Sequence, residues 1–346
     1  MKPGRDHSAV ALAAVPLLFL GAFYFYPLFE IFSVSLTFDG TWGLRNIINV
    51  FSAGYYARVL WFTTWQAALS TLLTLVLALP AAYVFARYRF PGKSLIQSLS
   101  AIPFVLPSVV VAAAFSALLG PRGLVNEWLM AIRGLESPPI RLEHTITFIL
   151  MAHVFYNFTV VMRIVGGFWS RIDPGLVQAA QVLGASPWQS FRKITLPLLR
   201  PGIMAASLLV FIFCFSSFGV ILILGGPRFA TIEVAVYRQA MHLFNLPMAA
   251  ALSLLQICFM FVFMWVYTRL QRAASVELTP EAGRIVQRDI ATGKDRLIVW
   301  GTVSFMLVLL AAPLLALAFR SLSTEGGLSL LYYRALFQNP SQSIFY

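Results

Sequence analysis

Long runs without charged residues dominate the sequence. Cutting it at every Asp, Glu, Lys, Arg and His, but reading through His153 and His242, leaves seven long apolar windows: 8–29, 59–86, 94–121, 145–162, 201–227, 239–268 and 297–319. A bilayer core of about 30 Å requires about 20 residues of helix. An eighth uncharged window, 174–191, is rich in Gln, Gly, Pro and Ser, so we expect it to lie at the membrane surface. The pattern predicts seven transmembrane helices.

The composition agrees with a membrane protein and excludes several other classes. Of the 346 residues, 59% are hydrophobic and 11% are charged, whereas soluble domains carry about 25% charged residues. This contrast excludes an ordinary soluble enzyme, a disordered protein and a nucleic-acid-binding domain, although the net charge is +12. The apolar runs are continuous, which favours helices over the alternating strands of a barrel. The fold class predicted is therefore an all-α polytopic membrane protein.

Lysines and arginines predict the orientation. If the N-terminus is cytoplasmic, the segments 1–8, 87–93, 163–200 and 269–296 face the cytoplasm, and they hold 16 of the 25 Lys and Arg residues. Cytoplasmic loops carry an excess of positive charge, most reliably when they are short. The shortest of these loops, from Arg87 to Lys93, holds three cations. We therefore expect the N-terminus to lie inside the cell.

Two short helices are predicted in the loop between the fourth and fifth windows. An N-cap oxygen followed by proline favours a helix start, and glycine favours a left-handed helix end. These signals are Asp173-Pro174, Ser186-Pro187, Gly184 after the first helix and Pro197, which we expect to end the second. Leu176, Ala180 and Leu183 would share one stripe. Such a stripe suits a groove on another protein or lipid headgroups, and periodicity alone does not decide between them.

The same loop carries a motif with several fixed positions. The motif residues are Gln178, Ala179, Ala180, Gly184, Ile194, Leu196 and Pro197. This spacing resembles the EAA loop of ABC-importer permeases, and the resemblance covers roughly residues 55–270. In that family the loop forms a coupling helix that docks in a cleft of the ATPase subunit. Gln178 stands where the family usually has Glu, so one charge is lost.

The resemblance implies a type I importer permease that moves its solute by alternating access. ATP and Mg would be bound by a partner ATPase dimer, and this chain would hold no cofactor or metal and would not be an enzyme. A solute-binding protein would meet the outer loops 120–144 and 225–246, and the bacterial inner membrane would be the location. Four further segments resemble thiamine and ferric-iron permeases, so thiamine or ferric iron is the expected solute. They are 153–157, 215–219, 224–226 and 231–237.

Relatives in this subfamily are often fused permeases with two homologous halves, and the C-terminal residues resemble the start of a second half. The segment from Phe319 to Gly326 resembles that from Phe32 to Gly40, with Thr324 matched to Thr37, and Tyr332-Tyr333 resembles Tyr55-Tyr56. The expected organisation is an N-terminal helix and outer loop (1–54), a permease core with its coupling loop (55–270, 173–197), a cytoplasmic linker (271–296) and a truncated second half (297–346). We also expect 297–319 to pack poorly, since its partners would lie in that second half. A homodimer is the alternative source of the second half.

Two polar residues of the fourth window lie one helical turn apart. His153 and Asn157 share a helix face, and polar groups inside a span often mark a translocation pathway. The simpler interpretation, which we favour, is a satisfied hydrogen bond between helices. An ion-coupled secondary transporter would need intramembrane ionisable groups, and a membrane enzyme would need clustered catalytic groups. The four histidines are widely scattered, and we identify no catalytic or metal-ligating set.

Overall fold

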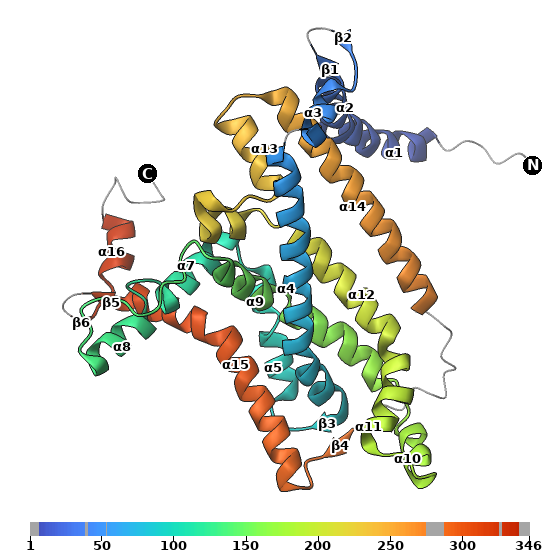
Figure 1. Ribbon diagram of the computed structural model, residues 1–346, viewed down its shortest axis with the longest axis vertical. Coiled ribbons are helices and arrows are strands. Elements are labelled where there is room, and N and C mark those ends of the chain that lie inside the picture. Colours follow the sequence, from blue (N-terminus) through green and yellow to red (C-terminus); the bar gives the residue numbers. More distant parts are fainter. Residues whose placement is uncertain (1–6, 39–40, 53, 275–286, 325–326, 339–346) are drawn as a thin grey trace, which may run out of the picture. The chain divides into compact units, whose positions relative to one another are not determined.

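The computed structural model describes residues 7–38, 41–52, 54–274, 287–324 and 327–338. These residues are mostly helical (Figure 1). The chain divides into two compact units, and two of the three boundaries between them fall inside long helices. The first unit comprises Met1–Thr64 and Ala230–Met264, and the second comprises Trp65–Phe229 and Trp265–Tyr346. Residues 275–286 of the predicted linker, Glu325, Gly326 and residues 339–346 lie outside the described residues.

The first unit begins with a long helix that contains one π-helical turn. Its elements in order are α1 (His7–Leu20), the π-turn η1 (Gly21–Phe25), α2 (Tyr26–Ser35), β1 (Thr37–Phe38), β2 (Thr41–Trp42), α3 (Arg45–Ser52), the start of α4 (Gly54–Arg87), α13 (Ile232–Met241) and the first part of α14 (Leu246–Ala274). The buried Asn46 amide donates to the carbonyls of Ser35 (3.2 Å) and Thr37 (3.0 Å), which fixes the turn after α2.

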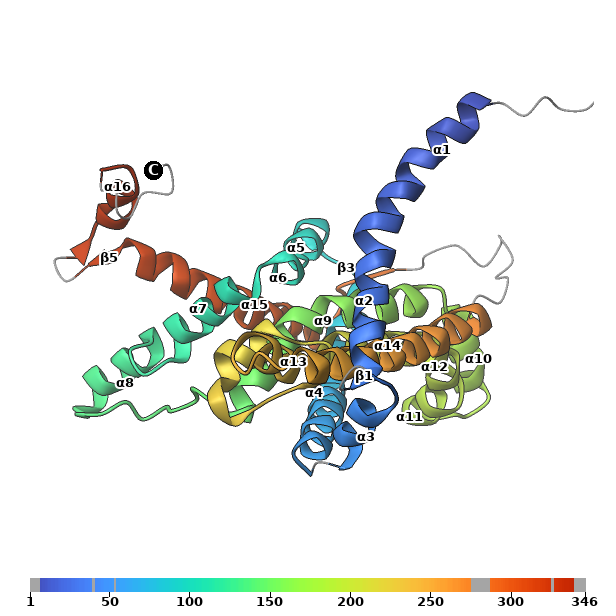
Figure 2. The same cartoon turned by 90° about the horizontal axis from the view of Figure 1, so that it is seen from above.

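The second unit contains the core of the bundle. Its elements after α4 are β3 (Tyr88–Arg89), α5 (Lys93–Leu99), α6 (Ile102–Val105), α7 (Ser108–Leu119), α8 (Leu124–Arg133), α9 (Ile146–Ser170), α10 (Pro174–Val182), α11 (Pro187–Ser190), the π-turn η2 (Phe191–Thr195), α12 (Leu196–Phe215), the π-turn η3 (Ile221–Gly225), the 3-10 turn η4 (Gly226–Arg228), β4 (Arg288–Asp289), α15 (Gly293–Leu322), β5 (Ser323–Thr324), β6 (Gly327–Leu328) and α16 (Leu331–Gln338). The most buried helix is α9, which packs along α12 (Figures 1 and 2).

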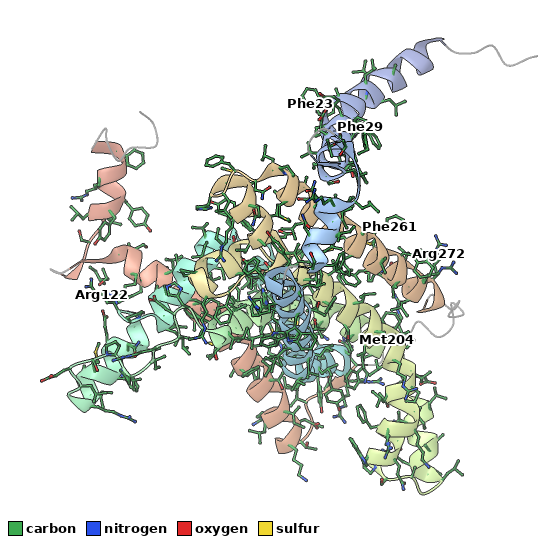
Figure 3. The ribbon with its side chains drawn as sticks, turned by 45° about the horizontal axis from the view of Figure 1, so that its top comes forward. Phe23, Phe29, Arg122, Met204, Phe261 and Arg272 are labelled. Carbon is green, nitrogen blue, oxygen red and sulfur yellow. The ribbon has the colours of Figure 1, made fainter. Side chains whose placement is uncertain are left out.

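The prediction of seven membrane-crossing helices is confirmed in number. The described residues contain seven helices that are long and apolar enough: Ala14–Ser35, Gly54–Arg87, Ser108–Arg133, Ile146–Ser170, Pro187–Phe215, Leu246–Arg272 and Gly293–Leu322. Large apolar side chains project outward from them, among them Phe23, Phe29 and Phe261 (Figure 3). Outward-facing apolar residues suit contact with lipid tails.

The third span begins later than the window 94–121 predicts. Pro103 and Pro107 interrupt that window, and the backbone at Leu106 is extended (ψ 139°), so α5 and α6 are short helices that precede the span. A residue before proline is disfavoured in the helical region. The span therefore runs from Ser108 to Arg133.

The fifth span also differs from its predicted window, 201–227, and Pro197 does not end a helix. The helix that starts at Pro187 passes through the wide turn η2 and continues as α12 to Phe215. π-turns interrupt the regular helical hydrogen-bond ladder, so the imino nitrogen of Pro197 is accommodated in the first turn of α12. After Phe215 the helix ends at Ser216. The uncharged window 201–227 is therefore not continuously helical.

The expectation that residues 297–319 pack poorly is wrong. α15 packs along α7 in the second unit. Its buried positions are Asp295, Val299, Val303, Met306, Leu310, Pro313 and Ala316, which recur every three or four residues. This spacing places them on one face of the helix. The seventh span is therefore an integrated part of its unit.

A helix–hairpin–helix segment occurs twice in the chain. The order α2, β1, β2, α3 in the first unit is repeated as α15, β5, β6, α16 in the second. Adding 286 to the residue numbers of Thr37–Phe38 gives Ser323–Thr324, and the same offset converts Arg45–Ser52 into Leu331–Gln338. The same offset relates two backbone hydrogen bonds of 2.7 Å, from Gly43 N–H to the Leu36 carbonyl and from Ser329 N–H to the Leu322 carbonyl.

The repeat corrects two residue pairings proposed from sequence. Thr37 corresponds to Ser323 rather than to Thr324, a shift of one residue. Tyr332 lies in α16 and corresponds to Asn46 of α3, whereas Tyr55 belongs to α4. The two Tyr-Tyr pairs therefore do not occupy equivalent positions in the two copies of the segment.

Candidate functional site

The 173–197 loop has the local structure that its caps predict. The Asp173 carboxylate accepts from the backbone N–H of Gly175 (2.8 Å) and starts α10. Ser186 and Gln189 form a capping box that starts α11. Gly184 between them is left-handed, with φ +90°. The two predicted helix starts and the turn at Gly184 are confirmed, but only the first helix is short, because the second continues through η2 into α12.

The surface of this loop is unusually apolar for an exposed segment. Leu183 and Val182 are each 88% exposed, and Leu176 and Trp188 are also exposed. Of the motif residues, Gln178, Ala179 and Ala180 lie on α10, Ile194 lies in η2, and Leu196 and Pro197 begin α12. The loop therefore joins an exposed apolar surface directly to a membrane-crossing helix.

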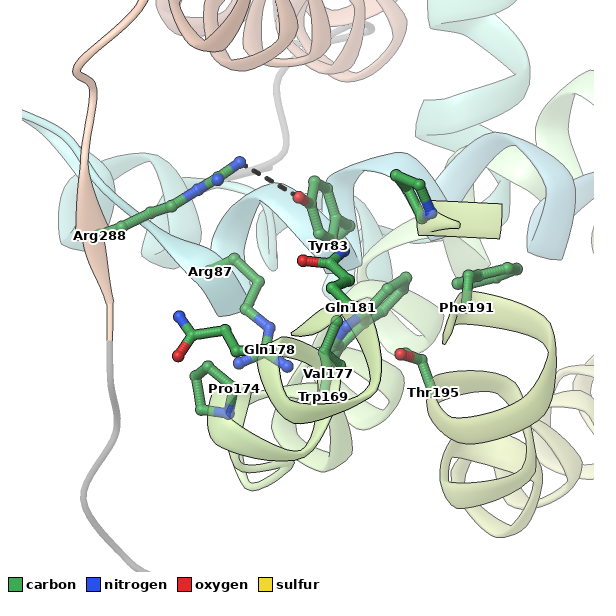
Figure 4. A pocket seen from close by; sticks show the side chains of 11 residues that line it. Tyr83, Arg87, Trp169, Pro174, Val177, Gln178, Gln181, Phe191, Thr195 and Arg288 are labelled. Carbon is green, nitrogen blue, oxygen red and sulfur yellow. Dashed lines mark hydrogen bonds between the residues drawn. The ribbon is translucent and has the colours of Figure 1, made fainter. Parts of the chain in front are cut away.

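A second side of the loop borders a cavity of about 690 Å³, which we call the loop cavity (Figure 4). Its lining comes from the end of α4, from α9, from the loop and from β4: Tyr83, Arg87, Trp169, Pro174, Val177, Gln178, Gln181, Pro187, Phe191, Thr195 and Arg288. Tyr83, Trp169, Phe191 and Trp188 form a continuous series of ring contacts, with centroids 5.1, 6.3 and 5.6 Å apart. This aromatic series connects the exposed Trp188 to α4.

The end of α4 is tied to the segment that precedes α15. β3 pairs with β4 in parallel, with Tyr88 opposite Arg288. The Tyr88 hydroxyl donates to the Asp295 carboxylate (2.7 Å), and the Arg288 guanidinium contacts Tyr88, Tyr83 (3.3 Å) and Asp295 (3.1 Å). Burial and the bond to Asp295 raise the pKa of the Tyr88 hydroxyl. Sequence analysis missed this network, which joins residues far apart in the chain.

His153 and Asn157 lie in a buried polar cluster. The two ring nitrogens of His153 each lie 2.9 Å from a serine hydroxyl, Nδ1 from Ser70 and Nε2 from Ser217. The Asn157 amide donates to the His153 carbonyl (2.9 Å) and toward Cys214 Sγ (3.5 Å). His153 thus has the satisfied bonds between helices that the simpler interpretation expects.

The same two residues also line a cavity of about 280 Å³, the helix-break cavity. Its wall contains two breaks in helical structure, around Leu106 and around Ser217, and no Asp, Glu, Lys or Arg among the lining residues. Non-helical backbone at membrane depth is tolerated where it is buried in protein or lines a cavity. Both interpretations of His153 and Asn157 therefore stay open. The prolines at 103 and 107 were the sequence signal for one of these breaks.

Removal of one bond to His153 should measure how much the polar cluster stabilises the bundle. We expect Ser217→Ala to lower the free energy of unfolding by about 0.6 kcal/mol, up to about 1.7, the range for hydrogen bonds between membrane helices. Ser207→Ala is the control, because the Ser207 hydroxyl bonds to Ile203 in its own helix (2.6 Å). Thermal unfolding in detergent compares the two. Equal stability of both variants would contradict the structural role.

The segment 231–237 belongs to the first unit, and partly buried polar side chains form hydrogen bonds in and beside it. The Gln256 amide donates to the Glu233 carboxylate (3.0 Å), and the Gln239 amide donates to the Tyr56 hydroxyl (2.7 Å). Burial raises the pKa of Glu233. Gln66, in the second unit, donates to the Cys214 carbonyl (2.9 Å). The amides of Gln66, Gln239 and Gln256 therefore bond to neighbouring elements.

Comparison with known proteins identifies relatives of this chain. The family of binding-protein-dependent transport system inner membrane components matches residues 74–276. The thiamine transport system permease protein ThiP of Brucella abortus (strain 2308) is 35% identical over 205 residues, which cover 59% of this chain and 37% of that protein. ThiP of Escherichia coli (strain K12) is 33% identical over 219 residues, covering 61% and 39%. The chain thus spans well under half the length of these curated relatives.

A shorter relative and a solved structure extend the comparison. The 2-aminoethylphosphonate transport system permease protein PhnU of Salmonella choleraesuis (strain SC-B67) is 26% identical over 257 residues, covering 74% of this chain and 90% of that protein. A bacterial alginate ABC transporter shares the fold, with a TM-score of 0.62 at 20% identity and coverage of 79% and 97%. These relatives are named as transport proteins rather than enzymes. The chain is a multi-pass membrane protein that belongs to the family of binding-protein-dependent transport system inner membrane components.

Proposed function

We propose that this chain is the permease subunit of an ATP-driven importer and that a separate ATPase dimer docks on the 173–197 loop. The observation that supports the proposal best is the exposed apolar surface of Leu176, Val182, Leu183 and Trp188 on a loop with two ordered caps. Exposed apolar patches mark interaction sites. ATP and Mg would be held by the partner, and Gln178, Ala179, Ala180, Gly184, Ile194, Leu196 and Pro197 would transmit its movement.

The proposed location is the bacterial inner membrane, with the N-terminus in the cytoplasm. The excess of Lys and Arg in the segments that include this loop supports that orientation. A solute-binding protein would then meet the loops 120–144 and 225–246 on the opposite face.

The proposed solute route passes the helix-break cavity. Interrupted helices in transporters often surround the substrate site, and the breaks at Leu106 and Ser217 both border this cavity with His153 and Asn157. Thiamine is the first candidate solute, because the ThiP relatives are named for thiamine transport. The PhnU relative adds 2-aminoethylphosphonate, and ferric iron is the candidate from sequence resemblance.

We also propose that residues 297–346 open a second permease half. The repeated helix–hairpin–helix, at a constant offset of 286 residues, supports an internal duplication. A fused or separate second half, or a second copy of this chain, would complete the pathway.

Reconstitution tests the proposed function. The chain, with its ATPase and binding protein, is placed in proteoliposomes with labelled thiamine, ferric iron or 2-aminoethylphosphonate, with and without a second permease half. We expect ATP-dependent uptake of one solute, and greater uptake when the second half is present. Uptake that follows an ion gradient and ignores ATP would instead identify a secondary transporter. Full uptake without the added half would favour a homodimer.

A further inference from the structure

The loop cavity has a charge imbalance. Its lining contains two guanidinium groups, Arg87 and Arg288, and no carboxylate (Figure 4). Arg288 shares its charge with Asp295, which lies outside the lining. Arg87 donates to the Ile172 carbonyl (3.0 Å) and forms no ion pair within the described residues. The Asp173 carboxylate, which lies outside the lining, interacts electrostatically with Arg87 without forming an ion pair. The lining itself therefore holds a half-buried cation and no carboxylate, which favours the binding of an anion.

The rest of the lining can hydrogen-bond to such an anion without repelling it. Gln178 and Gln181 extend from α10 into the same cavity as Arg87, and Thr195 lies on the η2 side (Figure 4). The nearest acid in sequence, Asp173, uses its carboxylate to cap α10. Because Gln178 is neutral, the residues that line the cavity with Arg87 supply no carboxylate.

The position of the cavity indicates a small occupant rather than the docked ATPase. Val177 and Gln181 of α10 border the cavity, one helical turn apart, whereas Leu176 and Leu183 are exposed to solvent on another side. A protein seated on Leu176 and Leu183 would cover the outer side and leave the cavity behind the loop. A volume of about 690 Å³ falls in the usual range for small-molecule sites.

We propose that the loop cavity binds a phosphate-type oxyanion through Arg87, with Gln178, Gln181 and Arg288 as further contacts. Guanidinium groups bind phosphate oxygens with strong, charge-assisted hydrogen bonds. The source is a free phosphate compound or a phospholipid headgroup. The ligand bridges the loop, α4 and β4, so it favours whichever arrangement of the loop contains the cavity.

A binding experiment on the purified chain tests this site without transport. Inorganic pyrophosphate is titrated in detergent, with chloride at matched ionic strength, and the unfolding temperature is followed. We expect pyrophosphate to stabilise the wild type, and Arg87→Gln to weaken its apparent Kd at least about tenfold. Gln178→Glu keeps both arginines but adds a carboxylate to the lining, so it should also weaken the apparent Kd for pyrophosphate. Arg192→Gln, which removes an exposed cation of the same loop outside the lining, is the matched control.

The outcomes are separable. Equal responses of wild type, Gln178→Glu and Arg192→Gln would overturn the site, and this comparison holds even if Arg87→Gln fails to fold. Nanodiscs of phosphatidylglycerol and of phosphatidylcholine distinguish the sources: loss of the wild-type pyrophosphate response only in phosphatidylglycerol identifies headgroups, and its persistence in both identifies a free compound. The assay uses no ATP and no transported solute, so its failure leaves the proposed import function intact.

Discussion

Gly219→Ala should abolish most uptake by the reconstituted transporter and lower its unfolding temperature. A Cβ at this position would overlap Ser108 Oγ and lie 2.7 Å from Ser108 Cβ. Ser108 begins α7, and Gly219 follows the break after α12, so the added methyl group must separate two walls of the helix-break cavity. Overpacking of this kind costs about 1–3 kcal/mol. Uptake and thermal unfolding measure the two effects.

A second substitution should reverse the first. Ser108→Gly removes both atoms that the new methyl group would meet, so the double variant should recover stability and uptake toward the level of Ser108→Gly alone. Gly167→Ala is the matched control, because that glycine of α9 has no atom within 4 Å of its added Cβ. Loss of uptake in Gly219→Ala without rescue by Ser108→Gly would count against steric closeness as the cause.

Gly184→Val should uncouple transport while the protein still inserts and accumulates. Gly184 has φ +90° and open space around it, so the effect comes from backbone strain rather than from a clash. The left-handed conformation costs a residue with a side chain about 1–2 kcal/mol, and it is least suited to a β-branched one. The turn between α10 and α11 should therefore distort. Co-purification with the ATPase, and ATP-driven uptake, should both fall.

Two controls test whether the loss of coupling comes from backbone strain at position 184. Gly134 ends α8 with φ +60° and open space, so Gly134→Val imposes similar strain far from the loop in sequence and should leave ATPase binding intact. Gly184→Asn should retain more activity than valine, because asparagine tolerates left-handed backbone. Normal transport by Gly184→Val would contradict a role for this turn in coupling.

Much of the fold followed from local sequence signals. The number of spans came from uncharged length. The starts of α10 and α11 and the turn between them came from Asp173, Ser186 and Gly184, whose caps act within three residues. Span ends were less predictable, because an uncharged run does not report where helices break. Pro107 moved the start of the third span, and Pro197 failed to stop the fifth because a π-turn precedes it.

The candidate sites were only partly predictable, because their partners lie far apart in sequence. His153 and Asn157 could be paired from their helical spacing, but Ser70 and Ser217 could not be assigned to them. The same holds for Arg87 and Arg288 around the loop cavity, and for α7 against α15. These contacts depend on how helices pack, and one-dimensional periodicity contains no information on which helices become neighbours.

The pairing of Tyr88 with Arg288 has a consequence for biosynthesis. The two residues are 200 positions apart, so at about 5–20 residues per second the ribosome makes Arg288 about 10–40 s after Tyr88. Throughout that interval the end of α4 lacks its strand partner and its bond to Asp295. This region completes its native contacts only after the sixth span has been translated.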